Sequence, residues 1–472
     1  MEPVQAALAR GLRDLLPGEM IARQRMIAAI QGVYELYGFV PISTPAIEHL
    51  RILSDSGGAE ASASIFRVQG PEDDLLGLRF DLTVPLSRLV AQYPELPRPF
   101  RRYQVGPVYR ADKPGPGRFR EFTQFDLDSV GVPSEIADAE IIAGMCDTLT
   151  ALQVGPFRVR FSSRGVLNLL MPLAGIDPGL APDVFRVLDK LDKIGPEKVR
   201  RELTTGYKDE SGDPIPGVGL RPDQVDRIET FLAIKGDTRD EILAGLTEVF
   251  RGVEGAATAI DPLARISRHL KNLGYHEDRA VIDLSIARGL AYYTGPVFEA
   301  VLLDAPEFGS VFGGGRYDDL VMRFLGERVP ATGASIGVDR LLAALIKLGR
   351  TGTRRATARI LITTIDPALT DDYLAMTYEL RRAGVAAEMY LGAEKGLGKQ
   401  IKYADRCGIP LVAIYGSDEK AKGTVTLKDL EAGAAGAAAL QKDRSQWRQL
   451  RPGQFEVSRA ELVKAVKDFA AL

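Results

Sequence analysis

The sequence predicts an α+β protein in which a helical segment interrupts a β-rich domain and a small α/β domain follows. Three observations carry this prediction. Segments of alternating polarity fill 79–130 and return at 280–302, with the period of two that half-buried strands show. Between them, 170–275 is charged and mostly helical. From 359 onward, strand-like and helix-like stretches alternate, which is typical of a partly parallel sheet.

Length and composition bound the class of protein. A chain of 472 residues exceeds one compact core, so two to four domains are expected. The net charge of −3 argues against a generally basic protein that coats nucleic acid, but it allows local basic patches. The two cysteines, Cys146 and Cys407, form no CxxC pair, so no disulfide framework or zinc site is predicted. With no secretory signal and no membrane-spanning run, we expect a cytoplasmic protein.

The first part of the β-rich domain, 1–169, opens with a helix predicted over Met20–Tyr37. Its apolar residues recur at helical spacing, and Gly38 ends it; they are Met26, Ile30, Val33 and Tyr37. The stretch FVPISTPAIE then indicates a short strand that Pro41 and Pro45 interrupt, which suits an edge or an interface.

The remaining boundaries follow from changes in pattern. The helical insertion is placed at 170–275, with a loop expected at 208–219. The β-rich domain resumes over 276–350 and closes with a helix in VDRLLAALIKLG. A linker is predicted at 351–358, and the α/β domain fills 359–472.

The most informative stretch is FRRYQVGPVYRADKPGPGRFREFTQFDLDSVG at 100–131, two alternating segments around a Pro/Gly break. From its charge alone it could be a solvated basic hairpin. Strand side chains alternate between faces, however, and this sorts them by chemistry. One face would carry Arg118, Phe122, Gln124 and Asp128, and the other Phe125 and Leu127. A surface hairpin gains nothing from such sorting, so a ligand-binding floor over a packed core is the better hypothesis.

Those residue types suit a nucleotide phosphate and a polar amino acid. An arginine grips phosphate oxygens with two parallel hydrogen bonds, and Phe122 could stack on a base. Gln124 and Asp128 can bind an ammonium group or an imidazole. Two further arginines, Arg288 and Arg340, lie near glycines that let backbone approach a ligand closely.

Other motifs allow plainer interpretations. The glycines of FGGGRYDDL at 312–320 are more often a flexible turn, and no GxxxxGK[ST] phosphate loop is present. Tyr292 and Tyr293 could equally be core residues. The three histidines, His49, His269 and His276, have no metal-ligand spacing.

Several motifs together resemble the histidyl-tRNA synthetases, a class II aminoacyl-tRNA synthetase family. They are VYRADKPGPGRFREFTQFDLDSVG, RGLAYYTGPVFEA, GGGRYDDL and ATGASIGVDRLL, and the similarity extends to LRFDLTVPLSR at 78–88 and GLGKQIKYADRCG near the end. The resemblance implies a six-stranded antiparallel sheet flanked by helices, a helical insertion domain and a C-terminal α/β anticodon-binding domain. It also implies a homodimer with the segment around Pro45 near the interface.

The resemblance implies an activity as well. Histidine and ATP, the latter with Mg²⁺, would form histidyl-adenylate, and the histidyl group would pass to the 3′-hydroxyl of the terminal adenosine of tRNA-His. Histidine, ATP and tRNA-His are thus the expected partners, without DNA or membrane. Independently of the resemblance, paired arginines such as Arg101 and Arg102 are more often a solvated or tRNA-facing patch than a catalytic element.

The roles carry over at matching positions only. Arg110 would hold the ATP α-phosphate and the amino-acid carboxylate, Arg118 the γ-phosphate and Arg340 the triphosphate, with Phe122 stacked on adenine and Glu121 also at the ATP site. Asp81 and Thr83, on one strand face, would bind the α-amino group with Gln124. Asp128 and Tyr293 would contact the two imidazole nitrogens, with Tyr292 beside them. Arg110, Arg288 and Gln124 would be catalytic, Arg288 at the α-phosphate, and no protein metal ligands are assigned.

The sequence departs from the family pattern at two places. Ala291 stands where the family usually has aspartate, and Asp319 where it usually has glycine. Arg288 and Tyr293 have opposite strand parity, so a turn or bulge at Gly289 is expected. The Ala-rich stretch 431–440 and the tail with Trp447 lie beyond the matched part and could contact tRNA or a partner subunit.

Two other functions remain open. One is a non-charging paralogue that senses histidine as a regulatory subunit of ATP phosphoribosyltransferase. The other is a catalytically dead synthetase that binds RNA. Proteins of the first kind lose the C-terminal domain and the ATP-site arginines, whereas this chain keeps both.

Overall fold

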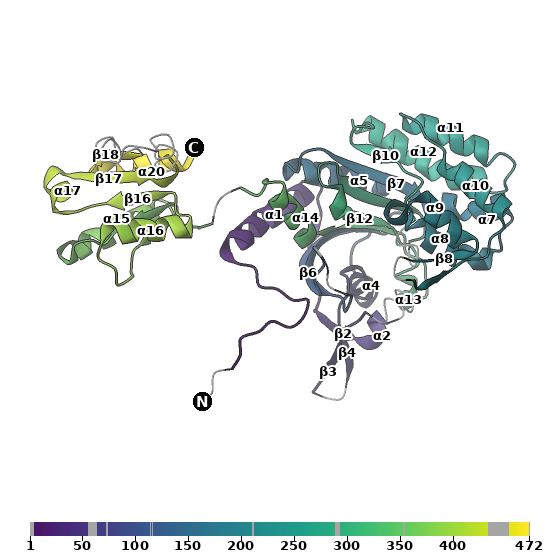
Figure 1. The fold of residues 1–472 in the computed structure, drawn as a ribbon, viewed down its shortest axis with the longest axis horizontal. Helices are drawn as coiled ribbons and strands as arrows, with labels where there is room; N and C mark the ends of the chain where they lie inside the picture. Colours follow the sequence, from purple (N-terminus) through teal and green to yellow (C-terminus); the bar gives the residue numbers. More distant parts are fainter. Residues whose placement is uncertain are drawn as a thin grey trace. The chain divides into compact units, whose positions relative to one another are not determined.

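The computed structural model describes residues 4–54, 64–71, 74–113, 115, 117–209, 212–287, 293–352, 355–432 and 453–471 (Figure 1). The chain divides into two compact units. The first comprises Met1–Arg13 with Arg25–Thr351, and the second comprises Asp14–Gln24 with Gly352–Leu472. In the described part, no helix combines the length and the apolar character needed to cross a membrane.

The first unit is built on an eight-stranded sheet in the order β1-β5-β6-β13-β12-β11-β7-β10. The six strands from β5 to β7 are antiparallel, which confirms the predicted six-stranded sheet. Two short edge strands pair in parallel with these six. One lies in the short edge strand predicted around Pro41, and the other begins the β-like segment predicted from 280. The bounds are β1 Val40–Pro41, β5 Phe100–Tyr109, β6 Glu121–Val130, β7 Phe157–Ser163, β10 Ala280–Ile282, β11 Pro296–Leu302, β12 Ser310–Arg316 and β13 Ala331–Gly337.

Helices cover the apolar face of this sheet. Helix α5 (Ile136–Ala151) packs against β6, β7, β11, β12 and β13, and α1 (Pro17–Leu36) brings Tyr34 edge-on to Phe125, with ring centroids 5.1 Å apart. Phe125 and Leu127 are 0% and 1% exposed, as alternation in β6 predicted. Burial of each such side chain stabilises the fold by about 1.5–3 kcal/mol. Gly38, at φ +76°, follows α1, in the left-handed conformation that glycine tolerates best.

Smaller elements complete the first unit around the sheet. A small sheet has the strand order β2-β4-β3, and α2 and α4 lie near it (Figure 1). Helix α14 follows β13. The bounds are β2 Ile47–His49, α2 Leu50–Leu53, β3 Arg67–Gln69, β4 Leu75–Leu78, α4 Thr83–Gln92, α13 Met322–Leu325 and α14 Val338–Lys347, with the 3-10 helix η2 at Pro306–Phe308.

The segment between β7 and β10 is mostly helical, as its charge and periodicity predicted. Its elements are α6 Arg164–Asn168, α7 Leu170–Ala174, η1 Pro178–Leu180, α8 Ala181–Leu188, α9 Leu191–Leu203, β8 Gly206–Lys208, β9 Pro214–Pro216, α10 Pro222–Leu232, α11 Arg239–Val249 and α12 Ala256–Asn272. Helix α11 starts at a capping box in which Thr238 and Glu241 satisfy each other's backbone N–H groups, as helix starts require. The loop expected at 208–219 is wrong in part, because β8 and β9 pair there as a two-stranded ribbon.

The second unit holds a five-stranded sheet in the order β15-β14-β16-β17-β18. β14 is parallel to both of its neighbours and the other pairs are antiparallel, so the predicted partly parallel sheet is confirmed. The bounds are β14 Ile360–Ile362, η3 Pro367–Leu369, α15 Thr370–Arg382, β15 Ala387–Met389, α16 Leu397–Cys407, β16 Leu411–Ile414, α17 Ser417–Lys422, β17 Thr424–Asp429, β18 Gln454–Ser458, η4 Arg459–Glu461 and α20 Leu462–Ala471.

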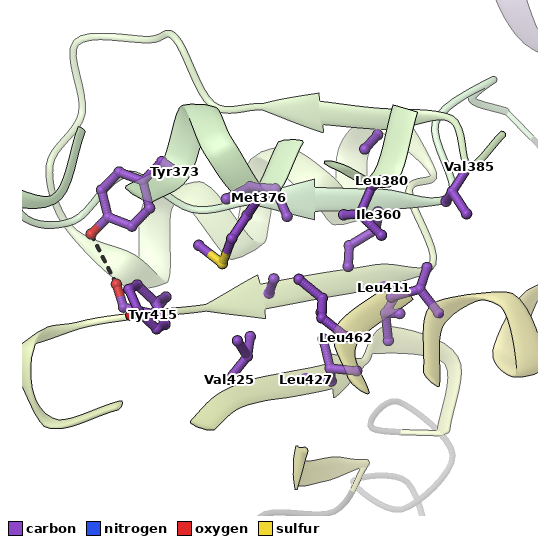
Figure 2. Close-up of a cluster of buried hydrophobic side chains, with 14 of the residues drawn as sticks. Ile360, Tyr373, Met376, Leu380, Val385, Leu411, Tyr415, Val425, Leu427 and Leu462 are labelled. Carbon is purple, nitrogen blue, oxygen red and sulfur yellow. Dashed lines mark hydrogen bonds between the residues drawn. The ribbon is translucent and has the colours of Figure 1, made fainter. Parts of the chain in front are cut away.

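The core of the second unit is almost wholly apolar (Figure 2). Tyr373, Met376 and Leu380 recur along α15 at helical spacing and face Leu411 and Leu427 of the sheet. The one polar contact drawn there is a hydrogen bond of 2.9 Å from the Tyr373 hydroxyl to the carbonyl oxygen of Tyr415. A buried hydroxyl needs such a partner. The Ala-rich stretch and Trp447 fall at 433–452, outside the described residues.

Candidate active site

The polar face of β6 forms the floor of a cavity of about 710 Å³. Its walls come from the β5–β6 connection, from β12 and β13, and from the starts of α4 and α14. All of these belong to the first unit. Nine of the predicted site residues line it, namely Asp81, Thr83, Arg110, Arg118, Phe122, Gln124, Asp128, Tyr293 and Arg340.

Alternation along β6 places the floor residues. Phe122, Gln124, Asp126 and Asp128 all line the cavity, while Phe125 and Leu127 are buried in the core. The basic-hairpin interpretation is therefore wrong. Arg118 also lines the cavity, but it precedes the strand and forms only an isolated bridge with Gly115, so its predicted position on the strand is wrong. The Pro/Gly break ends the strand pairing before that position.

Two arginines at one end of the cavity are held by protein contacts. The Arg110 guanidinium lies over the Phe122 ring, 5.1 Å from its centroid, and its Nε donates to the carbonyl oxygen of Phe80 at 3.1 Å. Nη1 of Arg340 donates to the carbonyl oxygen of Ser310 at 2.8 Å. A guanidinium can bind phosphate oxygens through two parallel hydrogen bonds, which suits both arginines to a phosphate ligand.

The start of α14, which carries Arg340, is tied to the floor by Asp339. One carboxylate oxygen of Asp339 accepts the backbone N–H of Thr123 at 2.6 Å. The other accepts Nη2 of Arg13 at 2.9 Å, and the Arg13 guanidinium lies 4.1 Å from the centroid of the Phe119 ring. The segment GLRD near the start of the chain thus fixes the connection between β5 and β6 against α14.

Buried carboxylates occupy the other end. Asp128 is 2% exposed; its Oδ1 accepts the hydroxyl of Tyr317, and its Oδ2 lies 2.7 Å from Nη2 of Arg102. Burial raises the pKa of Asp128, and the nearby Arg102 guanidinium opposes that rise. Burial likewise raises the pKa of Asp126 to about 7. A carboxylate held in this way is a fixed acceptor for a cationic or N–H-bearing ligand.

Asp81 and Thr83 lie on the wall, but the predicted strand there is wrong. Thr83 begins α4, and Asp81 just precedes it and accepts the backbone N–H of Val84 at 3.1 Å. An aspartate before a helix competes well for the unpaired N–H groups of the first turn, which favours a helix start over a strand. Burial raises the pKa of Asp81 to about 6, against the lowering effects of that N–H group and of Arg110.

The glycines of FGGGRYDDL do not form a flexible turn. They belong to β12, in the middle of the sheet. A Cβ atom on Gly314 would lie 2.1 Å from the carbonyl oxygen of Gly333, and one on Gly315 would lie 2.9 Å from Cδ1 of Tyr293. Only glycine permits so close an approach, and this brings Tyr293 to the cavity.

Arg101 and Arg102 do not form a solvated pair. Arg102 is 0% exposed and points to the cavity side, where it meets Asp128. Arg101 points away; it stacks on Phe39 and pairs with Glu140 at 2.7 Å. The prediction is wrong for Arg102, because neighbours on a strand face opposite sides.

Some predicted residues are not brought to the cavity. Glu121 is exposed at the start of β6 and does not line it. Arg288, Ala291 and Tyr292 lie outside the described residues, and so does the bend expected at Gly289. Among the residues that the structure does describe, no three His, Cys, Asp or Glu side chains gather as metal ligands.

Three residues of the site were missed from sequence. Asp126 has the same strand parity as Gln124 and Asp128, so alternation could have found it. Arg102 contacts Asp128 because β5 pairs with β6. Tyr317 contacts it from the position directly after β12. No local pattern shows such contacts.

The fold is that of a class II aminoacyl-tRNA synthetase. The antiparallel sheet carries one cavity with arginines at one end and carboxylates at the other. Arginines suit the charge that develops on a phosphate during displacement, and buried carboxylates suit an amino acid with an ammonium group.

Comparisons with known proteins narrow the class. A family model described as histidyl-tRNA synthetase matches residues 11–341, and one described as an anticodon binding domain matches 359–468. The histidine–tRNA ligase of Cereibacter sphaeroides is 45% identical over 485 residues, covering 98% of this chain and 97% of its own. This chain belongs to the histidyl-tRNA synthetase family.

Solved structures show the same fold. The histidyl-tRNA synthetase from Nostoc has a TM-score of 0.82 and 32% identity, with 99% of this chain and 100% of that chain covered. A protein from Bacillus halodurans described as an ATP phosphoribosyltransferase regulatory subunit/histidyl-tRNA synthetase has a TM-score of 0.69 and 23% identity, over 85% of this chain and 97% of its own. At that identity it shows the shared fold alone.

Proposed function

We propose that this protein is a histidine–tRNA ligase that makes histidyl-adenylate and then charges tRNA-His. The observation that carries the proposal is a cavity, floored by the polar face of β6, that brings phosphate-binding arginines and buried carboxylates together. A histidine bound along β6 would present its carboxylate to Arg110 and its ring to Asp128.

The ATP end is assigned as follows. Arg110 binds the α-phosphate and the histidine carboxylate, Arg118 the γ-phosphate, and Arg340 the triphosphate, while adenine stacks on Phe122. Arg288 also acts at the α-phosphate. Mg²⁺ enters with ATP as part of the substrate. A histidine carboxylate oxygen attacks the α-phosphorus, and pyrophosphate leaves in line. Positioned cations lower the barrier because they stabilise the charge on the transferring phosphoryl group.

The histidine end recognises both the backbone and the ring of the amino acid. Asp81, Thr83 and Gln124 bind the α-ammonium group. Asp128 and Tyr293 contact the imidazole nitrogens, with Tyr292 beside them. An amino acid that left buried Asp128 unpaired would lose roughly 1–3 kcal/mol, which supports discrimination against other side chains.

In the second step the terminal ribose 3′-hydroxyl of the tRNA attacks the carbonyl carbon of histidyl-adenylate, and AMP leaves. A phosphate oxygen of the substrate accepts the proton. We assign recognition of the anticodon to the second unit, and we place the protein in the cytoplasm as a homodimer. We also propose that the domains meet at the boundaries predicted from sequence, at 169/170, 275/276, 350/351 and 358/359.

The test is histidine-dependent exchange of pyrophosphate into ATP by the purified protein, followed by charging of a set of tRNAs. We expect exchange with histidine alone among the amino acids, and charging of tRNA-His alone. Histidine binding without exchange would instead identify a histidine-sensing regulatory protein. Exchange without charging would place the fault in tRNA recognition.

A further inference from the structure

Arg102 lies in β5 directly opposite Asp128 of β6, on the cavity side of the sheet. Its side chain is 0% exposed. A guanidinium keeps its charge in proteins, and the loss of water around such a group is costly. A buried guanidinium therefore needs partners that compensate for the lost water.

One nitrogen of Arg102 links the two ends of the amino-acid site. Nη2 lies 2.7 Å from Oδ2 of Asp128, the carboxylate that we assign to the imidazole. The same nitrogen donates to the carbonyl oxygen of Leu82 at 3.2 Å. Leu82 stands between Asp81 and Thr83, which we assign to the α-ammonium group. A single nitrogen atom therefore contacts both the carboxylate assigned to the imidazole and the turn assigned to the α-ammonium group.

Arg316, another buried arginine of this unit, is bonded differently. Arg316 uses Nε, Nη1 and Nη2, which donate to Asp138 and to the carbonyl oxygens of Val132 and Ser134. Nε and Nη1 of Arg102, in contrast, have no hydrogen-bond partner within the described part of the chain. Buried donors are normally satisfied. Arg102 is therefore placed for its contacts at Nη2 rather than for the most stable packing.

The charges around Asp128 give the guanidinium a second effect. Asp126 lies 3.8 Å from the same Nη2, and Arg102 opposes the rise that burial causes in the pKa of both carboxylates. Asp81 adds a further negative charge near Asp126, and Arg79 a positive one. The hydroxyls of Tyr317 and Ser335 bind the pair, whereas Tyr34 packs against Phe125 on the other face of β6. Arg102 is the cation closest to Asp128 in this set, so it favours the ionised form.

We propose that Arg102 is a positioning residue for histidine, which fixes the Asp128 carboxylate and the Asp81–Thr83 turn at one spacing. This inference rests on the proposed function and adds a determinant of amino-acid selectivity to it. Arg102 itself contacts neither ATP nor tRNA in this proposal.

The test compares three variants with the wild type. Arg102→Met removes the charge and the donors, and Arg102→Lys keeps one charged donor. Arg101→Met is the matched control, because it removes a neighbouring arginine that faces the other side of the sheet. Histidine binding is measured by calorimetry without ATP, and KM for histidine and for ATP by pyrophosphate exchange at pH 6.5 and pH 8.5.

We expect Arg102→Met to raise KM for histidine about ten-fold or more, the effect of losing one charged contact, and to change KM for ATP less than about two-fold. Arg102→Lys should recover most of the loss. The loss in Arg102→Met should be larger at pH 6.5 than at pH 8.5, because the carboxylates bind protons more readily without the cation. Arg101→Met should show none of these effects.

The proposal is wrong if a folded Arg102→Met raises both KM values equally, if a folded Arg102→Lys recovers nothing, or if the loss is the same at both pH values. If neither single variant folds, Arg102→Met combined with Asp126→Asn removes the charge imbalance and takes their place. If that variant also fails to fold, Arg102 is a structural residue and the proposal falls. A wild type that binds histidine without exchange overturns the proposed function but leaves the calorimetric comparison decisive.

Discussion

The two ends of the cavity carry opposite charges, and they differ in how those charges are handled. At the ATP end, Arg118 is exposed, and Arg110 is partly exposed and donates a hydrogen bond to the carbonyl oxygen of Phe80. At the histidine end, Asp126 and Asp128 are 1% and 2% exposed and lie against Arg102. The same strand, β6, connects the two arrangements.

This difference has a physical reason in the ligands. A triphosphate brings several negative charges. Arginines that stay in water can bind it, and keeping them exposed costs the unliganded protein little free energy. An imidazole is small and weakly charged, and an acceptor must be held in place to distinguish it from other side chains. Holding Asp128 requires burial, and burial costs free energy unless partners such as Arg102 and Tyr317 compensate.

The largest expected effect separates the two ends. Asp128→Asn should raise KM for histidine about 100-fold, since a contact from a ring N–H to an ionised carboxylate is worth up to about 3 kcal/mol. KM for ATP should stay within about two-fold. Pyrophosphate exchange at varied histidine and ATP concentrations measures both. Asp278→Asn, at a carboxylate that is 72% exposed, serves as the control, and comparable effects from the two variants would remove Asp128 from the histidine site.

A smaller effect is expected at the ATP end. Arg118→Ala should raise KM for ATP about ten-fold, with little change for histidine, because an exposed charged contact is worth roughly 1.5 kcal/mol. Salt screens exposed charges, so the difference from wild type should shrink at high ionic strength. Arg251→Ala, which removes a cation that is 76% exposed on the helical insertion, is the control. An effect of Arg118→Ala that salt does not change would mean that this arginine is buried in the complex.

The smallest effect concerns pH. Burial raises the pKa of Asp81 to about 6 and that of Asp126 to about 7, so both carboxylates are ionised above these values. As the pH falls through 7 and then 6, they take up protons and histidine affinity should fall. Asp126→Asn removes a negative charge near Asp81, which lowers the pKa of Asp81 and should shift the acid limb to lower pH.

The pH profile of histidine binding, measured by calorimetry for both proteins, checks this shift. Free histidine titrates near pH 6.5, but identically in both experiments, so it cancels in the comparison. A limb that stays in place or moves to higher pH would contradict the coupling between the two carboxylates.

Local periodicity determined much of the fold. The alternation of strand-like and helix-like stretches from 359 onward predicts a partly parallel sheet in the second unit, and the parity of Phe125 and Leu127 predicts which face of β6 is buried. The same parity predicts that Phe122, Gln124 and Asp128 share the other face, and all three line the cavity. These predictions succeed because a helix or strand repeats its geometry every few residues, so sequence spacing translates directly into a face.

Tertiary structure decided the contacts that no period encodes. The parallel pairing of the edge strands β1 and β10 is not shown by their local pattern. The glycines of β12 became strand because neighbouring backbone leaves no room for side chains, and Asp81 precedes a helix rather than lying in a strand. The contacts of Asp128 with Arg102 and Tyr317 join residues far apart in the chain. Sequence by itself determined which side chains face the cavity; pairing between distant strands decided which charges are buried there and what holds them.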